Sequence, residues 1–141
     1  MCLAVSALVP TLSANAIREL AAQHRPAAGC RCAALQCAGW ETLPATFDET
    51  SLRRLGRVSG ADAYDEPTHE EYHPDATRYG SPDAPIALGH FPYNRCEVWQ
   101  CEHCARTFLR YTEYGGYYID HRIRDVNPAL VIDSAAAPQK D

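Results

Sequence analysis

Cysteine is the residue type with the most evident chemistry in this sequence, and it occurs in two groups. Cys101 and Cys104 form a Cys-x2-Cys pair, and Cys30, Cys32 and Cys37 form a second group far upstream. Two thiolates at this spacing can point at one metal ion, and structural zinc sites use four such ligands in a tetrahedron. We therefore expect a structural zinc site that contains Cys101 and Cys104.

Two further ligands must complete this site, and several side chains are candidates. They are Cys96, His103, His90 and the upstream group Cys30, Cys32 and Cys37. We favour the upstream group, because two short thiol groups that supply two ligands each would close a four-coordinate site. Cys30 and Cys32 could chelate from an extended segment. Cys32 and Cys37 are separated by four residues, a spacing similar to that of the cysteine pairs in zinc knuckles, so both pairings stay open. Cys96 is better explained as a small buried strand residue.

The stretch VWQCEHCARTF, Val98 to Phe108, resembles the first half of a zinc ribbon or a related treble-clef finger. The resemblance is confined to residues 94–126, and it implies that Cys101 and Cys104 are zinc ligands. The sequence departs from the family pattern in two ways: Ala105 stands where such knuckles favour glycine, and no second Cys-x2-Cys pair follows. The resemblance therefore does not carry the whole fold of the family.

Two enzymatic alternatives use the same sequence differently. The run from His69 to His73 matches His-Glu-x-x-His, in which two histidines bind zinc and Glu70 would polarise a water molecule. Pro74 opposes helical geometry at His73, and the surrounding stretch offers no long helix. A Cys-x2-Cys pair can also cycle between dithiol and disulfide, but thioredoxin-like proteins place it at a helix N-terminus, and here a strand pattern follows. Both alternatives rank below the structural site.

A β-hairpin is the clearest element of secondary structure. Residues 107–114 and 117–126 are rich in aromatic and β-branched types and flank Gly115 and Gly116, which is typical of two strands joined by a tight turn. A two-residue turn predicts that Tyr114 faces Tyr117. In that register His121 lies roughly 20 Å along the ladder from Cys104, so we interpret it as a core or cross-strand histidine and not as a ligand.

Two helices are expected in the N-terminal part, residues 11–56. Residues 11–24 carry apolar side chains at helical spacing, with Thr11 or Ser13 as a cap. Asp48 resembles the N-cap of a second, short helix over residues 49–55, which Gly56 would end. The sequence thus predicts an α+β fold: N-terminal helices and a C-terminal antiparallel sheet of about three strands with a zinc knuckle.

The sequence as a whole predicts one zinc-binding domain over residues 1–133. Residues 59–90 hold four of the ten prolines and an acidic excess, and their tyrosines favour an ordered loop over a linker. The zinc knuckle and hairpin occupy residues 91–126, and residues 134–141 are expected to form a flexible tail. A chain of 141 residues is long enough for one core of ordinary size.

The charge and composition of the chain limit the classes of partner that it is expected to bind. The net charge is −5 and no basic stripe occurs, which argues against binding along a nucleic acid backbone without excluding it. The apolar N-terminus has no charged n-region and is too interrupted to cross a membrane, so a cytoplasmic location is expected, where thiols stay reduced. We expect a binding or adaptor protein and not an enzyme. The surfaces expected to meet a protein partner are the hairpin face that carries Tyr118, Arg122 and Arg124, and the acidic loop over residues 59–90.

Overall fold

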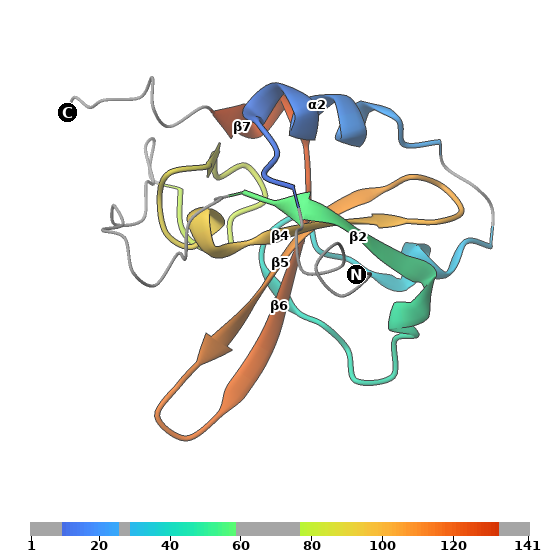
Figure 1. Ribbon diagram of the computed structural model, residues 1–141. Helices are drawn as coiled ribbons and strands as arrows, with labels where there is room; N and C mark the ends of the chain where they lie inside the picture. Colours follow the sequence, from blue (N-terminus) through green and yellow to red (C-terminus); the bar gives the residue numbers. More distant parts are fainter. Residues whose placement is uncertain (1–9, 26–28, 59–76, 133–141) are drawn as a thin grey trace, which may run out of the picture.

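A five-stranded antiparallel sheet forms the centre of the protein, with the strand order β1-β6-β5-β4-β2. The computed structural model describes residues 10–25, 29–58 and 77–132. The strands are β1 (Glu41–Thr42), β2 (Leu52–Arg57), β4 (Glu97–Cys101), β5 (Thr107–Tyr114) and β6 (Ile119–Asp125). The β5–β6 hairpin contains the two longest strands of the sheet, and its turn projects away from the rest of the molecule (Figure 1).

A smaller parallel pair and short helical turns complete the described parts of the chain. Strand β3 (Ile86–Ala87) pairs with β7 (Val131–Ile132). Single 3-10 turns are η1 (Arg31–Ala34), η2 (Glu49–Ser51), η4 (Tyr93–Arg95) and η5 (Pro128–Leu130). Of the expected loop over 59–90, residues 59–76 lie outside the described residues, as does the predicted tail, 134–141.

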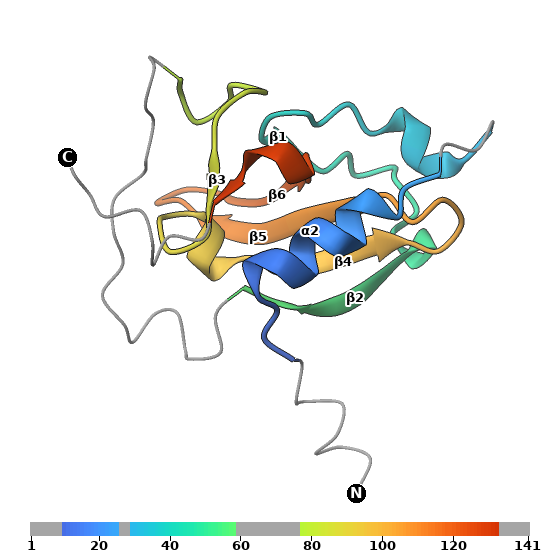
Figure 2. The same ribbon diagram turned by 90° about the horizontal axis from the view of Figure 1, so that it is seen from above.

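The predicted first helix is confirmed as α2 (Ala14–Ala22), the one α-helix in the described parts of the chain. Ser13 caps it, because its hydroxyl oxygen accepts a hydrogen bond from the Ala16 N–H group at 3.1 Å. Ala14, Ile17 and Ala21 form its buried face, and α2 lies across β4 and β5 (Figure 2). Arg18 ties the helix to the C-terminal strand by donating to the Val131 carbonyl oxygen at 2.9 Å.

The sheet is covered on both faces, so the strands divide their side chains between two cores. On the α2 side, Val98 and Leu109 pack with Ile17, Trp40 and Ile86. On the opposite side, Phe108 and Ile123 pack with a group of cysteines and with residues of the 35–52 segment. Neighbouring residues such as Phe108 and Leu109 point into different cores, as the alternation of a strand requires.

The predicted second helix is wrong. Asp48 does act as a cap, accepting the Thr50 N–H at 3.1 Å, but the helical geometry ends after the single turn η2. Leu52 onward forms strand β2, which pairs with β4 and enlarges the sheet beyond the predicted three strands. Edge pairing outweighs local helix propensity here, because the strand buries Leu52 against the second core and satisfies the β4 backbone.

The predicted hairpin is present, but its turn has four residues instead of two. Tyr114 pairs with Ile119 and Thr112 with His121, so residues 115–118 form the turn. The Gly115 N–H donates to the Tyr118 carbonyl oxygen at 2.8 Å, and a Cβ atom on Gly115 would collide with the Tyr118 ring. The shift is by two residues, an even number, so each side chain keeps its predicted face.

Among the described residues, Arg124 has the largest fully buried side chain. The expectation that it lies on an exposed face of the hairpin is therefore wrong. Its guanidinium donates to the carbonyl oxygens of Ala38 (3.1 Å), Pro82 (3.2 Å) and Ala84 (2.8 Å) and to the Tyr93 hydroxyl. One side chain of β6 thus joins the loop before β1 to the loop before β3. Burial of a cation is tolerable because these acceptors replace its water.

We predict that Arg124→Met lowers the free energy of unfolding by about 3 kcal/mol, because the carbonyl oxygens of Ala38, Pro82 and Ala84 and the Tyr93 hydroxyl lose their donor. Urea unfolding followed by circular dichroism measures the loss. Arg53→Met is the matched control: Arg53 is exposed on β2, and its change should be within about 0.5 kcal/mol. Equal effects of the two substitutions would contradict an anchoring role for Arg124.

Candidate metal centre

Four of the predicted cysteines converge on one point. The Sγ atoms of Cys30, Cys32, Cys101 and Cys104 all lie within 4.8 Å of one another. The separation is 3.5 Å from Cys30 to Cys32, 3.5 Å from Cys30 to Cys101 and 3.2 Å from Cys32 to Cys104. These four thiols are positioned to hold a metal ion, and the contacts from Cys30 to Cys101 and from Cys32 to Cys104 join residues 71 and 72 positions apart.

The separations match a tetrathiolate site around a single ion. Four sulfur atoms at about 2.3 Å from a tetrahedral zinc are about 3.8 Å from each other. A disulfide would need about 2.05 Å between two sulfur atoms. The four sulfur atoms are therefore too far apart for disulfides and close enough together to share one metal ion.

A tight turn between β4 and β5 presents Cys101 and Cys104. The Cys101 N–H donates to the Arg106 carbonyl oxygen at 2.8 Å, and the Ala105 N–H donates to the Cys101 carbonyl oxygen at 3.1 Å. Ala105 has a φ of 63°, a left-handed conformation that glycine adopts without strain. Ala105 thus occupies a left-handed position that usually holds glycine, and the turn still forms with alanine there.

The upstream pair is held by the 3-10 turn η1. Cys30 caps the turn, and its carbonyl oxygen accepts the Ala33 N–H at 3.0 Å, while that of Cys32 accepts the Leu35 N–H at 2.9 Å. The turn directs both Sγ atoms to the same side. Of the two pairings left open by the sequence, the structure brings Cys30 and Cys32 to the site.

Backbone N–H groups point at the sulfur atoms, as a bound thiolate requires. The His103 N–H lies 3.4 Å from Cys101 Sγ, and the Cys32 and Arg106 N–H groups face Cys30 Sγ and Cys104 Sγ. The Cys32 N–H is the main cause that lowers the pKa of Cys30 to about 7. Burial instead raises the pKa values of Cys32 and Cys104, so a cation is needed to hold them as thiolates.

Arg106 joins the two cysteine pairs directly. It follows the knuckle turn, and its guanidinium donates to the Cys32 carbonyl oxygen at 2.7 Å and to Asp125 at 3.1 Å. It also lies 4.9 Å above the Phe108 ring. Sequence reasoning missed this residue; its place directly after the Cys-x2-Cys-Ala turn was the available signal.

The other candidate ligands lie outside the cluster. Cys37 is buried near Arg106, with 4.0 Å between Arg106 Nη2 and Cys37 Sγ. Cys96 is buried, as the sequence predicted, but it lies directly before β4 and not within a strand, and its thiol faces the Pro92 carbonyl oxygen at 3.3 Å. His121 pairs with Thr112 across the hairpin, exposed and not in the core. Neither His90 nor His103 joins the four thiols.

The second predicted metal motif cannot be placed. His69, Glu70 and His73 all lie outside the described residues. Within the described ranges, the four-cysteine cluster is the one group of three or more metal-ligating side chains.

Comparisons with known proteins add no relative. Neither the models of known protein families, nor the curated proteins, nor the solved structures contain a match to this chain. Among the described residues, no helix has the length and apolar character needed to cross a membrane.

We predict that Ala105→Gly raises the free energy of unfolding by about 0.5–1 kcal/mol, because glycine relieves the left-handed strain at φ 63° and its extra chain entropy offsets part of that gain. Ala105→Val should lower it by about 1–2 kcal/mol, since a β-branched residue is worse there. Thermal unfolding of the metal-loaded protein separates the two variants. Destabilisation by glycine would contradict this conformation of the knuckle.

Proposed function

We propose that the chain is a small zinc-binding protein whose four-cysteine site is structural and whose surface serves as a protein-binding or adaptor module. The observation that carries this proposal is the convergence of Cys30, Cys32, Cys101 and Cys104. Four protein ligands would leave no open position for a reacting water, unlike the three-ligand sites of zinc enzymes. Tetrahedral sulfur sites suit zinc or iron, and zinc adds stability without redox chemistry.

The surroundings of the site support a structural role. Cys32, Cys101 and Cys104 are 2–3% exposed, and they pack with Leu52, Phe108 and Ile123 in the second core. A metal ion there would act as the centre of a core in which four of the nine buried residues are cysteines. Its binding energy would contribute to folding, as in other small zinc domains.

The protein-binding part of the proposal rests on the hairpin turn. Tyr114, Tyr117, Tyr118 and Ile119 are between 52% and 103% exposed, and they stand on the part of the hairpin that projects from the body (Figure 1). Tyrosine is enriched at protein interfaces, where its ring packs and its hydroxyl stays hydrogen-bonded. A reducing compartment such as the cytoplasm would keep the thiols available to the metal.

Thiol redox chemistry at Cys101 and Cys104 is the alternative, and the local structure gives it less support. Strand β5 follows the pair, whereas low-pKa redox cysteines commonly stand at a helix N-terminus. Each of these thiols also has a neighbour from the upstream pair, at 3.5 Å for Cys101 and 3.2 Å for Cys104. This arrangement favours a four-thiol site over a two-thiol one.

We predict one zinc ion per chain in protein purified without added metal, measured by native mass spectrometry and elemental analysis. Cys101→Ser and Cys32→Ser should each lose it, because a hydroxyl is a poor replacement for a thiolate ligand. Cys37→Ser is the matched control, since Cys37 lies on the same segment outside the four-thiol group, and it should keep the metal. A folded, metal-free wild type, or iron in place of zinc, would contradict the proposal.

Removal of the metal should loosen the second core before the first. Trp99 packs against the second core and Trp40 lies within the first, so each core has its own fluorescent reporter. In a Trp40→Phe background, a strong chelator should shift the Trp99 emission to longer wavelength; in Trp99→Phe, the Trp40 signal should change less. Restoring zinc should reverse the shift. An unchanged Trp99 signal after confirmed metal loss would show that the site does not organise this core.

A further inference from the structure

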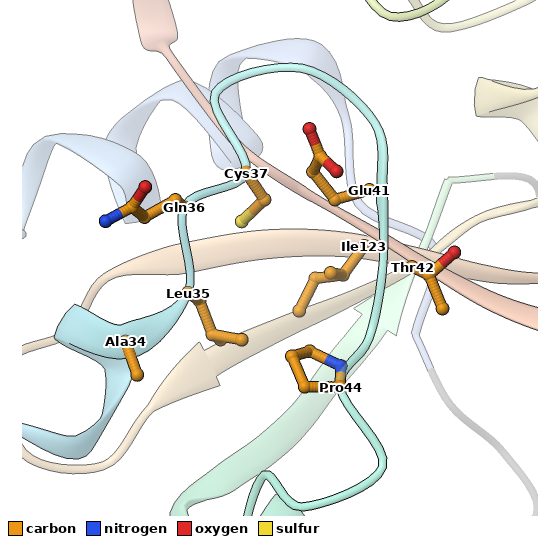
Figure 3. A pocket seen from close by; sticks show the side chains of 8 residues that line it. All are labelled: Ala34, Leu35, Gln36, Cys37, Glu41, Thr42, Pro44 and Ile123. Carbon is orange, nitrogen blue, oxygen red and sulfur yellow. The ribbon is translucent and has the colours of Figure 1, made fainter.

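A groove runs between the segment that carries Cys32 and the segment that leads into β2. It consists of two neighbouring depressions of about 380 and 320 Å³, which share the lining residues Ala34, Leu35 and Pro44. Figure 3 shows the larger one, with Leu35, Pro44 and Ile123 close together on one side of it. Depressions of roughly 300–1,000 Å³ are the usual size of ligand sites.

The larger depression has one ionisable acid among the eight residues that line it, Glu41. Its side chain points toward the segment that carries Cys37 (Figure 3). Burial raises the pKa of the Cys37 thiol to about 11, so that this thiol is neutral near pH 7. The Thr42 hydroxyl already donates to Asp120 at 3.0 Å. The charge that this depression offers a ligand is therefore negative.

Within the described parts of the chain, the Glu41 carboxylate takes part in no ion pair or hydrogen bond. Asp48, at the far end of the groove, is instead paired with Arg31 at 2.6 Å. An open carboxylate near exposed apolar side chains fits an ammonium or guanidinium group on an aliphatic stem, because the stem can lie against Ala34 and Pro44 while the cation meets the acid.

The smaller depression suits an apolar group. Phe47, Leu35, Pro44 and Ala34 line it, and the acid at its end is neutralised by Arg31. The two depressions meet at Leu35 and Pro44, so one extended chain can reach both. A free amine would fill only the larger depression and leave the smaller one open.

We propose that this groove binds an extended peptide segment of a partner protein, which places a basic side chain against Glu41 and an apolar side chain against Phe47. This inference rests on the proposed function, because it names the chemistry of the partner that the adaptor would take. A metal ion held by Cys32 would support the groove, because η1 contains both Cys32 and the wall residue Ala34. Nucleic acids and anionic lipids do not fit, since Glu41 repels phosphate.

The test is a titration of the ¹⁵N-labelled full chain, as purified, with acetylated and amidated tripeptides. The probes are lysine-alanine-leucine and the reverse order, with glutamate-alanine-leucine and n-butylamine as comparisons. A lysine peptide should shift amide signals in residues 34–44 and at Ile123. The glutamate peptide should leave these signals unchanged, and n-butylamine should bind more weakly than the better lysine peptide because it lacks the apolar contact.

Two variants and a control assign the binding to the groove. Glu41→Gln keeps the shape and removes the charge, and it should raise the Kd about fivefold, the effect of one solvent-accessible ion pair. Ala34→Arg adds a cation and bulk at an exposed position that both depressions share, and it should abolish binding. Glu19→Gln, an exposed acid on α2 outside the groove, should leave the Kd unchanged.

The metal content of each sample separates this inference from the proposed function. Metal-loaded wild type that binds neither lysine peptide would contradict peptide binding in the groove without contradicting the structural zinc site. Equal binding of n-butylamine and the peptides would also overturn it, since the site would then take a free amine. Metal-free protein that still binds the lysine peptides in the groove would support the groove and contradict the structural zinc site.

Discussion

The structure depends on the meeting of two cysteine pairs from distant parts of the chain. Cys32 and Cys104 are 72 residues apart, and their sulfur atoms are 3.2 Å apart. A cross-link over a loop of this length removes conformational entropy from the unfolded chain worth about 4 kcal/mol, in the same way as a disulfide. A metal ion that binds all four thiols would supply this link in a compartment where disulfides do not persist.

Two arginines extend this link into the rest of the fold. Arg106 donates to the Cys32 carbonyl oxygen and pairs with Asp125 on β6, so it joins the upstream cysteines to the hairpin. Arg124, one residue earlier on β6 and on the other face, joins the loops before β1 and before β3. The β5–β6 hairpin therefore connects both cores, and irregular segments are held to it by guanidinium groups that replace water at backbone carbonyl oxygens.

Local patterns predicted the parts of this fold that local chemistry determines. The cap at Ser13, the hairpin and the knuckle at Cys101 and Cys104 each depend on residues close together in sequence. Strand β2 was not predicted, because Asp48 and the residues after it have the sequence pattern of a capped helix. The strand forms because these residues pair with β4, which lies far away in the sequence. Arg124 was expected at the surface, since nothing in the sequence reveals that three distant carbonyl oxygens surround it. The choice of Cys30 over Cys37 likewise depends on the turn η1.

The most direct test of the central claim is X-ray absorption at the zinc edge on the purified protein. The account predicts a first shell of four sulfur atoms at about 2.3 Å, with no nitrogen or oxygen ligand. A shell that contains nitrogen or oxygen would contradict a site made of Cys30, Cys32, Cys101 and Cys104. The absence of zinc from folded protein would contradict the account as a whole.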